Sequence, residues 1–360
     1  MKLTKAWLIG LLIGLAFIVT ACGGSQEKNQ EKKETSSQST QAEQSQSKKN
    51  ETVRVLYSDS VFSLTTIVGL EKGFFAEEGL NVNAMPLSSG GMTVSGLIGK
   101  SADFAVGSFA RFLDAVNKDL PIIAVGVTTK GFQGYVIVPP DSNAKSIEDL
   151  KGKDIAVQMG SGTSSVFLRY LESKGLSPKD FKIREMDTEL IPAAFEAKQV
   201  AAGVPWDPFA TQIIEKGVGK VLLTPKDLAE PVKATYAFPL LTLEETIKKR
   251  PEMVQKFLNA WVKSLDFIHH NREEAIDILR AAFVNQVGLN VSREAVKNMV
   301  ETTYYTESTF DDEDIKDAYE SARIFYDFGI TKNAPPSLEK IKAHVNNTFA
   351  EKAEAQFRKK

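Results

Sequence analysis

The sequence predicts an α/β protein with two lobes, each built around a parallel-rich sheet, followed by a helical C-terminal region. Segments rich in β-forming residues alternate with helical segments from residue 53 to residue 223, a pattern typical of parallel sheets covered by helices. The alternation restarts after the glycine-bounded segment 131–134, so two α/β units are expected. The 308 residues of 53–360 are enough for two hydrophobic cores rather than one.

The first 21 residues are typical of a signal peptide. Lys2 and Lys5 precede an apolar run at 6–19, which is shorter than the roughly 20 residues that a membrane-spanning helix needs. The run ends in Val-Thr-Ala-Cys, where Cys22 is the only cysteine of the chain, and this ending resembles the lipobox of bacterial lipoproteins. The resemblance implies that Cys22 carries lipid and anchors the protein to the outer face of the cell membrane, on a Gram-positive-like surface or in a periplasm. An uncleaved N-terminal anchor with an incidental cysteine is the alternative.

Residues 22–52 comprise this cysteine and a polar segment whose composition differs sharply from that of the rest of the chain. After two glycines the segment contains Ser, Gln, Glu, Lys, Asn and Thr, and Ala42 is its only aliphatic residue. Such a segment cannot bury enough apolar area to offset the entropy lost on ordering, so a disordered tether is expected. Its lysines and glutamates balance, which favours a spacer over a charged binding arm.

Strands and helices are expected in order from residue 53. In the first unit the expected strands are 53–57, 80–87, 103–106 and 122–128. The expected helices there are 65–72, 91–98 and 109–117, with a further turn at 74–78. In the second unit the expected strands are 135–138, 154–158, 181–185, 200–204 and 221–223, and the expected helices are 146–150, 164–174, 190–197 and 209–216. The C-terminal helices are expected at 253–270, 272–283, 293–303, 311–328 and 337–353.

Charge and motifs argue against several classes of protein. The chain has 44 basic and 46 acidic residues, and without Lys2 and Lys5 the balance is 42 to 46, which argues against a nucleic-acid-binding surface. His269 and His270 are adjacent on an expected helix and point about 100° apart, so they make a poor pair of metal ligands. The sequence contains no zinc motif, dinucleotide fingerprint or nucleophile elbow. We therefore expect neither a metal nor a cofactor.

Four segments, in order along the chain, resemble the nitrate/sulfonate/taurine-type solute-binding proteins of ABC transporters. They are K-G-F-F-A-E-E-G-L-N-V at 72–82, G-K-S-A-D-F-A at 99–105, S-I-E-D-L-K-G-K at 146–153 and A-K-Q-V-A-A-G-V-P-W-D-P-F at 197–209. In the last segment Ala201 stands where the family usually has Asp, and Asp207 stands where it usually has Glu. The helical C-terminal region contains no segment of this kind.

The resemblance implies a periplasmic-binding-protein-like fold of type II, in which two lobes close on a ligand held between them. Lobe 1 is then expected to comprise 53–133 and 236–360, and lobe 2 to comprise 134–235. Crossovers between the lobes are expected near 131–135 and 235–240, and the C-terminal helices are expected to pack mainly on lobe 1.

The loops that follow the expected strands form the candidate binding site, because ligands of open parallel sheets bind beyond the carboxyl ends of the strands. The loop 160–165 is the most informative, since its glycines permit close approach and its N–H groups and hydroxyls suit an anion. Capping of the following helix is the alternative for this loop. The candidate residues in these loops are Ser58, Ser60, Phe62, Ser89, Gly90, Ser108, Phe109, Ser161, Gly162, Thr163 and Ser164.

Trp206 and Asp207 follow the expected strand 200–204 and complete the candidate site. Trp206 could stack on a ligand, and a buried packing role is equally consistent with its position. Arg111 could approach an anion from its helix, although a solvated or ion-paired arginine is the favoured interpretation.

These features predict a non-enzymatic solute-binding component of an ABC importer. The serine- and glycine-rich loops favour a small oxyanion such as an aliphatic sulfonate, taurine or nitrate. A thiamine-type pyrimidine or another aromatic heterocycle, held between Phe62 and Trp206, is the alternative ligand. The expected partners are an ABC permease and its ATPase, and the chain is expected to be a monomer that binds no nucleic acid. A solute-sensing surface receptor and a pyrimidine-synthase-like enzyme are the alternatives from other classes.

Overall fold

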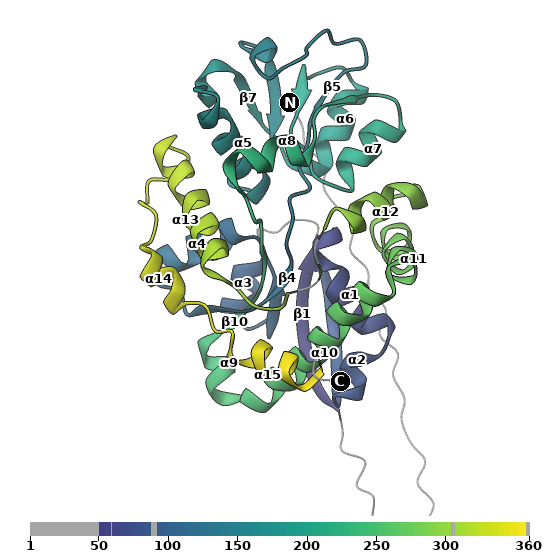
Figure 1. Cartoon of the computed structure of the whole chain (residues 1–360), viewed down its shortest axis with the longest axis vertical. Helices are drawn as coiled ribbons and strands as arrows, with labels where there is room; N and C mark the ends of the chain where they lie inside the picture. Colours follow the sequence, from purple (N-terminus) through teal and green to yellow (C-terminus); the bar gives the residue numbers. More distant parts are fainter. Residues whose placement is uncertain (1–49, 59, 88–91, 304, 306, 358–360) are drawn as a thin grey trace, which may run out of the picture. The chain divides into compact units, whose positions relative to one another are not determined.

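A computed structural model describes residues 50–357 except 59, 88–91, 304 and 306. The fold is carried by two five-stranded sheets, both of which mix parallel and antiparallel neighbours (Figure 1). The expected signal peptide, lipidated Cys22 and nearly all of the tether lie outside the described residues. Within the described residues, no helix combines the length and the apolar composition needed to cross a membrane.

The first sheet has the strand order β2-β1-β3-β10-β4. Its members are β1 (Glu51–Ser58), β2 (Leu80–Leu87), β3 (Phe104–Val106), β4 (Ile122–Thr129) and β10 (Phe238–Leu243). Strand β1 pairs in parallel with β2 and β3, whereas β10 runs antiparallel between β3 and β4. The chain therefore returns to this sheet through β10, after it has built the second sheet.

Strand β10 is the main element that the sequence analysis did not predict. All six of its residues are buried, so it lacks the alternating pattern that marks a half-exposed strand. It also contains Pro239, which cannot donate to a ladder and is unusual inside a sheet. The pairing with β4 shifts register between Phe238 and Pro239, an irregularity that accommodates the proline.

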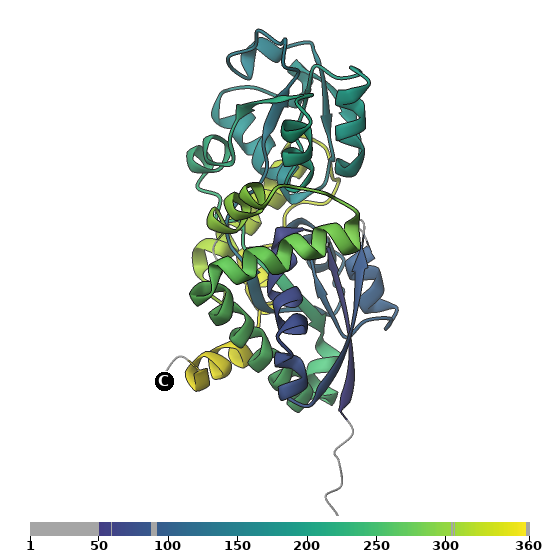
Figure 2. The ribbon, with the colours of Figure 1, turned by 90° about the vertical axis from the view of Figure 1, so that its right-hand side faces the viewer.

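Helices cover both faces of the first sheet. One face packs against α1 (Leu64–Glu71), α2 (Phe74–Glu77), α10 (Pro251–His270), α11 (Arg272–Ala282), α12 (Arg293–Glu301) and α15 (Thr348–Phe357). Trp261 of α10 is fully buried in this layer and donates its indole N–H to the carbonyl of Val127 at 3.1 Å. Helices α10 and α11 lie against α1 (Figure 2). The other face packs against α3 (Met92–Ile98), α4 (Phe109–Asn117), α13 (Asp312–Asp327) and α14 (Leu338–Ala343).

The second sheet has the strand order β7-β6-β8-β5-β9. Its members are β5 (Val136–Val138), β6 (Asp154–Val157), β7 (Lys182–Glu185), β8 (Ala202–Gly203) and β9 (Lys220–Leu223). Helices α5 (Gly162–Ser173) and α8 (Pro225–Ala229) cover one face, and α6 (Ile191–Glu196) and α7 (Phe209–Glu215) cover the other. Strand β5 is antiparallel to β8 and β9, so this sheet is mixed as well.

The structure differs from the predicted elements in three further respects. Two short helices were not predicted: α8, which begins at a capping box formed by Thr224 and Asp227, and α9 (Glu244–Lys249), which follows β10 directly. The segment expected to be helical at 146–150 contains only a 3₁₀ turn at Glu148–Leu150. The helix expected at 337–353 is instead two helices, α14 and α15, because Val345 between them forms a parallel bridge with Ala124 of β4.

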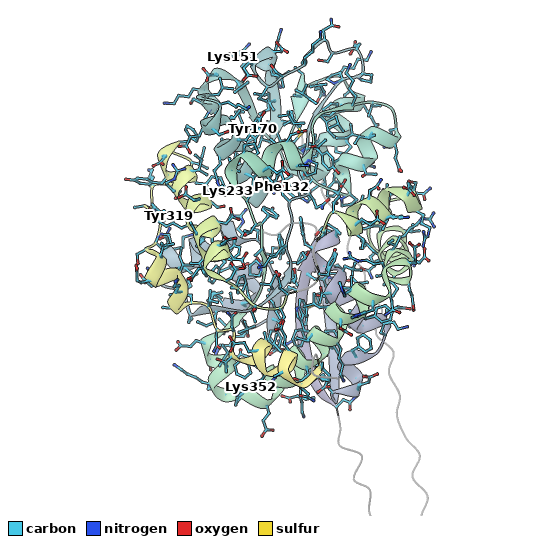
Figure 3. All side chains as sticks on the ribbon, viewed as in Figure 1. Phe132, Lys151, Tyr170, Lys233, Tyr319 and Lys352 are labelled. Carbon is cyan, nitrogen blue, oxygen red and sulfur yellow. The ribbon has the colours of Figure 1, made fainter. Side chains whose placement is uncertain are left out.

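The chain passes between the sheets through two segments, and helix α13 contacts the layers of both. The first segment, 130–135, joins β4 to β5, and Phe132 within it lies between the two sheets (Figure 3). The second segment, 233–237, leads back to β10. Helix α13 packs against both α4 and α5, so it touches the layers of both sheets.

Candidate functional site

A cavity of about 270 Å³ lies between the two sheets at the carboxyl ends of several parallel strands. Ser58, Leu87 and Val106 are the last residues of β1, β2 and β3, and all three line it. From the second sheet, Gln158 follows β6 and Thr188 follows β7. The cavity therefore occupies the position at which open parallel sheets bind ligands.

Most of the candidate residues that the structure describes line this cavity. Those that do are Ser58, Ser60, Phe62, Ser108, Ser161, Gly162, Thr163 and Trp206. Phe109, Ser164 and Asp207 do not line it. Ser89 and Gly90 lie outside the described residues.

Phe109 and Ser164 turn away from the cavity because neighbours within the protein engage them. The ring of Phe109 packs edge-on against Phe112 and Phe310, with centroids 5.8 Å and 5.4 Å away, inside the buried layer below α4. The hydroxyl of Ser164 donates to the carbonyl of Ser161 at 2.8 Å. An expectation based on loop position cannot distinguish residues whose side chains face the core from those that face the cavity.

Asp207, which follows Trp206 in the chain, is buried and hydrogen-bonded within the protein. Its carboxylate accepts hydrogen bonds from the Tyr135 hydroxyl at 3.0 Å and from the Thr211 amide and hydroxyl at 3.1 Å and 2.8 Å. Burial raises the pKa of Asp207 to about 6, although these donors act in the opposite direction. Trp206 also forms an isolated antiparallel bridge with Gly134. This bridge and the hydrogen-bonded Asp207 fix the backbone from which the indole of Trp206 projects.

The raised pKa of Asp207 predicts a pH-dependent stability that Asp207→Asn should remove. Between the ordinary pKa of 3.8 and about 6, the folded chain binds more protons at this site than the unfolded chain. The free energy of unfolding contributed by this site therefore falls as pH rises through that window, by about 3 kcal/mol. Urea unfolding of both proteins from pH 4 to pH 7 should show their difference changing by this amount. Parallel curves would contradict the assignment.

The residues at the start of α5 cap this helix and also line the cavity. Ser161 donates to the carbonyl of Gln158 at 2.7 Å and accepts from the amide of Ser164 at 3.0 Å, so it is the N-cap. The capping alternative for this loop is therefore correct, and Ser161 has little hydrogen-bonding capacity left for a ligand. Gly162 is required here, since a Cβ at this position would lie 2.5 Å from the Tyr236 hydroxyl oxygen.

Aromatic side chains form much of the cavity wall. Phe62 stacks on Phe238 with ring centroids 4.5 Å apart, and Tyr236 lies 5.6 Å from Phe62. Trp206 and Phe209 line the cavity from the second sheet. Tyr236 and Phe238 were missed in the sequence analysis because strand β10 was not recognised.

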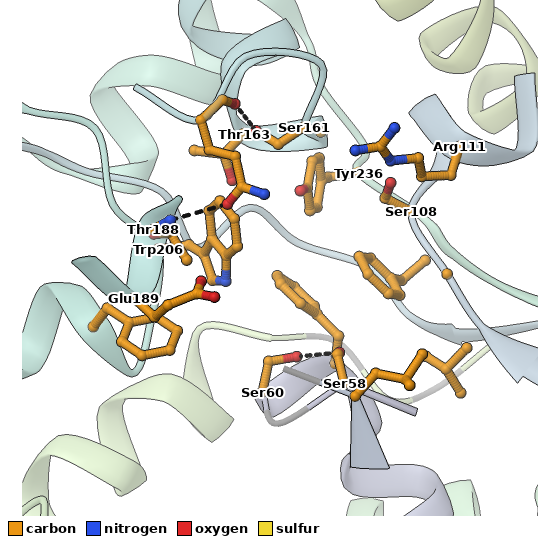
Figure 4. A pocket seen from close by; sticks show the side chains of 18 of the residues that line it. Ser58, Ser60, Ser108, Arg111, Ser161, Thr163, Thr188, Glu189, Trp206 and Tyr236 are labelled. Atoms are coloured by element: carbon orange, nitrogen blue, oxygen red, sulfur yellow. Dashed lines mark hydrogen bonds between the residues drawn. The ribbon is translucent and has the colours of Figure 1, made fainter. Parts of the chain in front are cut away.

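Among the described residues, two charged side chains line the cavity, and neither forms an ion pair or a side-chain hydrogen bond with another of them. Arg111 is the third residue of α4, and Glu189 lies in the 3₁₀ turn Thr188–Leu190; both are half-buried. Figure 4 places Arg111 and Ser108 beside Tyr236 at one side of the cavity, and Thr188 and Glu189 beside Trp206 at the opposite side. Arg111 is therefore not ion-paired with any described residue, and it lines the cavity. Glu189 had no recognisable sequence signal.

Thr188 adds an unsatisfied polar group to the Glu189 side. Its amide donates to the Gln158 side-chain oxygen at 3.0 Å, but its hydroxyl has no hydrogen-bond partner in the described part of the chain. The residue is only 1% exposed, and a buried polar group without a partner is costly. The cavity thus offers a cation, a carboxylate, several hydroxyls and an apolar lining, which together suit the binding of a small polar organic molecule.

Comparisons with known proteins agree with this geometry. A family model described as NMT1/THI5 like matches residues 63–275, more than half of the chain. A protein of Brucella abortus (strain 2308) that is provisionally named a binding protein is 29% identical over 245 residues, which cover 68% of this chain and 75% of the relative. A Bacillus subtilis (strain 168) protein provisionally named as aliphatic sulfonates-binding is 23% identical over 294 residues, which cover 80% and 84%.

A solved structure confirms the predicted periplasmic-binding-protein-like fold. It is the alkanesulfonate-binding protein SsuA of Xanthomonas axonopodis pv. citri bound to MOPS. The two structures align with a TM-score of 0.69 and 20% sequence identity, over 82% of this chain and 98% of that one. At this level of identity the similarity concerns the fold.

Proposed function

This chain belongs to the NMT1/THI5-like family, and we propose that it is the extracytoplasmic solute-binding component of an ABC importer. In this role it captures a small organic oxyanion, of the aliphatic sulfonate or taurine kind, and delivers it to a permease that works with an ATPase. The observation that carries the proposal is Arg111, whose guanidinium lies in the wall of a largely apolar cavity and has no partner among the described residues. The names of the sulfonate-binding relatives support the same ligand class.

The chain acts outside the cytoplasm as a non-enzymatic monomer. Lipid on Cys22 holds it at the membrane, and residues 22–52 separate the anchor from the binding fold. Its two lobes, 53–133 with 236–360 and 134–235, close over the ligand by bending at the two connecting segments. The side chains that line the cavity come from both sheets, which supports closure as the means of enclosing the ligand.

A second ligand class is supported by the aromatic lining. Phe62, Phe238 and Trp206 present ring surfaces to the cavity, and stacked rings favour a flat heterocycle. A bare nitrate ion has the weakest support of the predicted ligands, because it would leave this apolar surface uncovered.

Ligand-induced stabilisation tests the proposal. The purified protein should be melted with hexanesulfonate, taurine, nitrate and an aminopyrimidine, each over a range of concentrations. An organic sulfonate at 100 times its Kd is expected to add about 2.7 kcal/mol of apparent stability, which is readily seen as a rise in Tm. A rise with the pyrimidine alone would favour the second class, and no response to any sulfonate would contradict the proposed function.

A further inference from the structure

We propose that the ligand of this cavity is a zwitterion. One end is a sulfonate or a similar oxyanion bound by Arg111, the other end is a cationic nitrogen bound by Glu189, and an apolar or ring-bearing body lies between them. This inference rests on the proposed function and specifies the class of solute that the same site takes.

Arg111 and Glu189, two cavity charges without a partner in the part of the chain that the structure describes, carry the inference. Arg111 and Glu189 come from different sheets, α4 beside the first and the turn after β7 of the second. They lie at opposite sides of the cavity (Figure 4) and do not neutralise each other by an ion pair. Closing a cavity around a charged group without a partner is unfavourable, so a ligand that supplies both counter-charges is favoured.

A simple monoanion satisfies only half of this arrangement. It would neutralise Arg111, but it would also place a second negative charge in the same small enclosure as Glu189. Like charges in a partly desolvated site repel, and this repulsion discriminates against ligands that lack a positive group. Glu189 is therefore a specificity determinant rather than a general contact.

The surroundings of Glu189 suit a cationic nitrogen. Trp206 lies beside it in Figure 4, and the face of an indole attracts a cation electrostatically. The buried Thr188 hydroxyl, which lacks a partner among the described residues, can accept a hydrogen bond from an N–H group. On the other side, Arg111 and the Ser108 hydroxyl offer donors to an oxyanion.

The size and lining of the cavity determine the body of the ligand. A volume of about 270 Å³ is many times that of a four-atom ion, and it leaves room for a ring or a short alkyl chain. Phe62 and Phe238 lie along the cavity wall, where they can cover such a body. Taurine carries both charges but has only two carbons between them, which leaves most of this surface uncovered.

Two ligands that differ only in the positive charge test the proposal. In 3-(1-pyridinio)propanesulfonate the ring is a permanent cation, and 3-phenylpropanesulfonate has the same shape without that charge. Titration calorimetry with the wild-type protein is expected to show about tenfold tighter binding of the pyridinio compound. Glu189→Gln should abolish this preference by weakening the pyridinio compound while leaving the phenyl compound unchanged or tighter.

The control variant is Glu185→Gln. Glu185 is exposed at the end of β7 and does not line the cavity, so this change removes the same charge from the protein surface and should leave the preference intact. Equal binding of the two compounds, or a preference that survives Glu189→Gln, would overturn the zwitterion inference while leaving sulfonate binding in place. Failure of both compounds to bind would overturn the proposed function as well.

Discussion

Replacing Arg111 by glutamine is expected to weaken the binding of organic sulfonates by about 30- to 1,000-fold without lowering the stability of the unliganded protein. Removing one partner of a charge-assisted pair in an enclosed site costs about 2–4 kcal/mol. Stability should be unchanged because the guanidinium makes no ion pair or hydrogen bond with any other described residue. Calorimetric titration gives the affinity, and urea unfolding without ligand gives the stability.

Two further variants separate the role of the guanidinium from that of charge alone. Arg111→Lys keeps the charge but loses the planar fork of donors, so an intermediate loss of affinity is expected. Lys118→Gln removes a charge just after the same helix, where Lys118 forms an exposed pair with Asp114, and it should have little effect. If Lys118→Gln weakens binding as much as Arg111→Gln, the effect is one of net charge and the assignment of Arg111 fails.

Replacing Asp317 by alanine is expected to destabilise the fold by about 3 kcal/mol. Its carboxylate and the Arg169 guanidinium are each only 6% exposed and meet at 2.5 Å, which joins α13 to α5. Alanine would leave Arg169 buried without its counter-charge, a change that typically costs 3–5 kcal/mol. We expect the lower end of this energy range because both residues line a second cavity, of about 450 Å³, through which water can reach the unpaired Arg169.

Asp317 also holds the second connection between the sheets. Its other carboxylate oxygen accepts from the Tyr236 amide at 3.0 Å, and a second amino group of Arg169, Nη2, donates to the Val232 carbonyl at 2.6 Å. Urea unfolding of the single variant and of a double variant tests this arrangement. Arg169→Met combined with Asp317→Leu should recover much of the stability lost in Asp317→Ala, because no charge is then left unpaired. A loss below 1 kcal/mol in Asp317→Ala would show that the pair contributes little.

The sequence predicted the fold well because its signals are local. The strands up to β9 and most of the helices between them were identified in order, and the rule that ligands bind beyond strand ends identified eight residues of the cavity wall. The failures have non-local causes. Strand β10 is specified by its pairing with β3 and β4 in the buried sheet rather than by its own residue pattern. Pro239 also makes the segment look unlike a central strand.

The candidate site could be located but not resolved residue by residue. Phe62 and Phe109 occupy similar loop positions, yet one lines the cavity and the other packs on Phe112 and Phe310. Only the packing of distant elements distinguishes them. Glu189 is one of 46 acidic residues, and nothing in its neighbours sets it apart until the fold places it opposite Arg111.

Tyr236 has a consequence for how ligand preference can change during evolution. It lines the cavity, covers the start of α5 and lies on the segment that connects the sheets, where its amide is bonded to Asp317. A substitution there alters ligand contacts and the conformation of the connection together, so it is constrained by two requirements at once. Leu87 and Phe209 also line this cavity, but neither belongs to a connecting segment. New specificities should therefore arise first at those positions, while Tyr236 stays fixed.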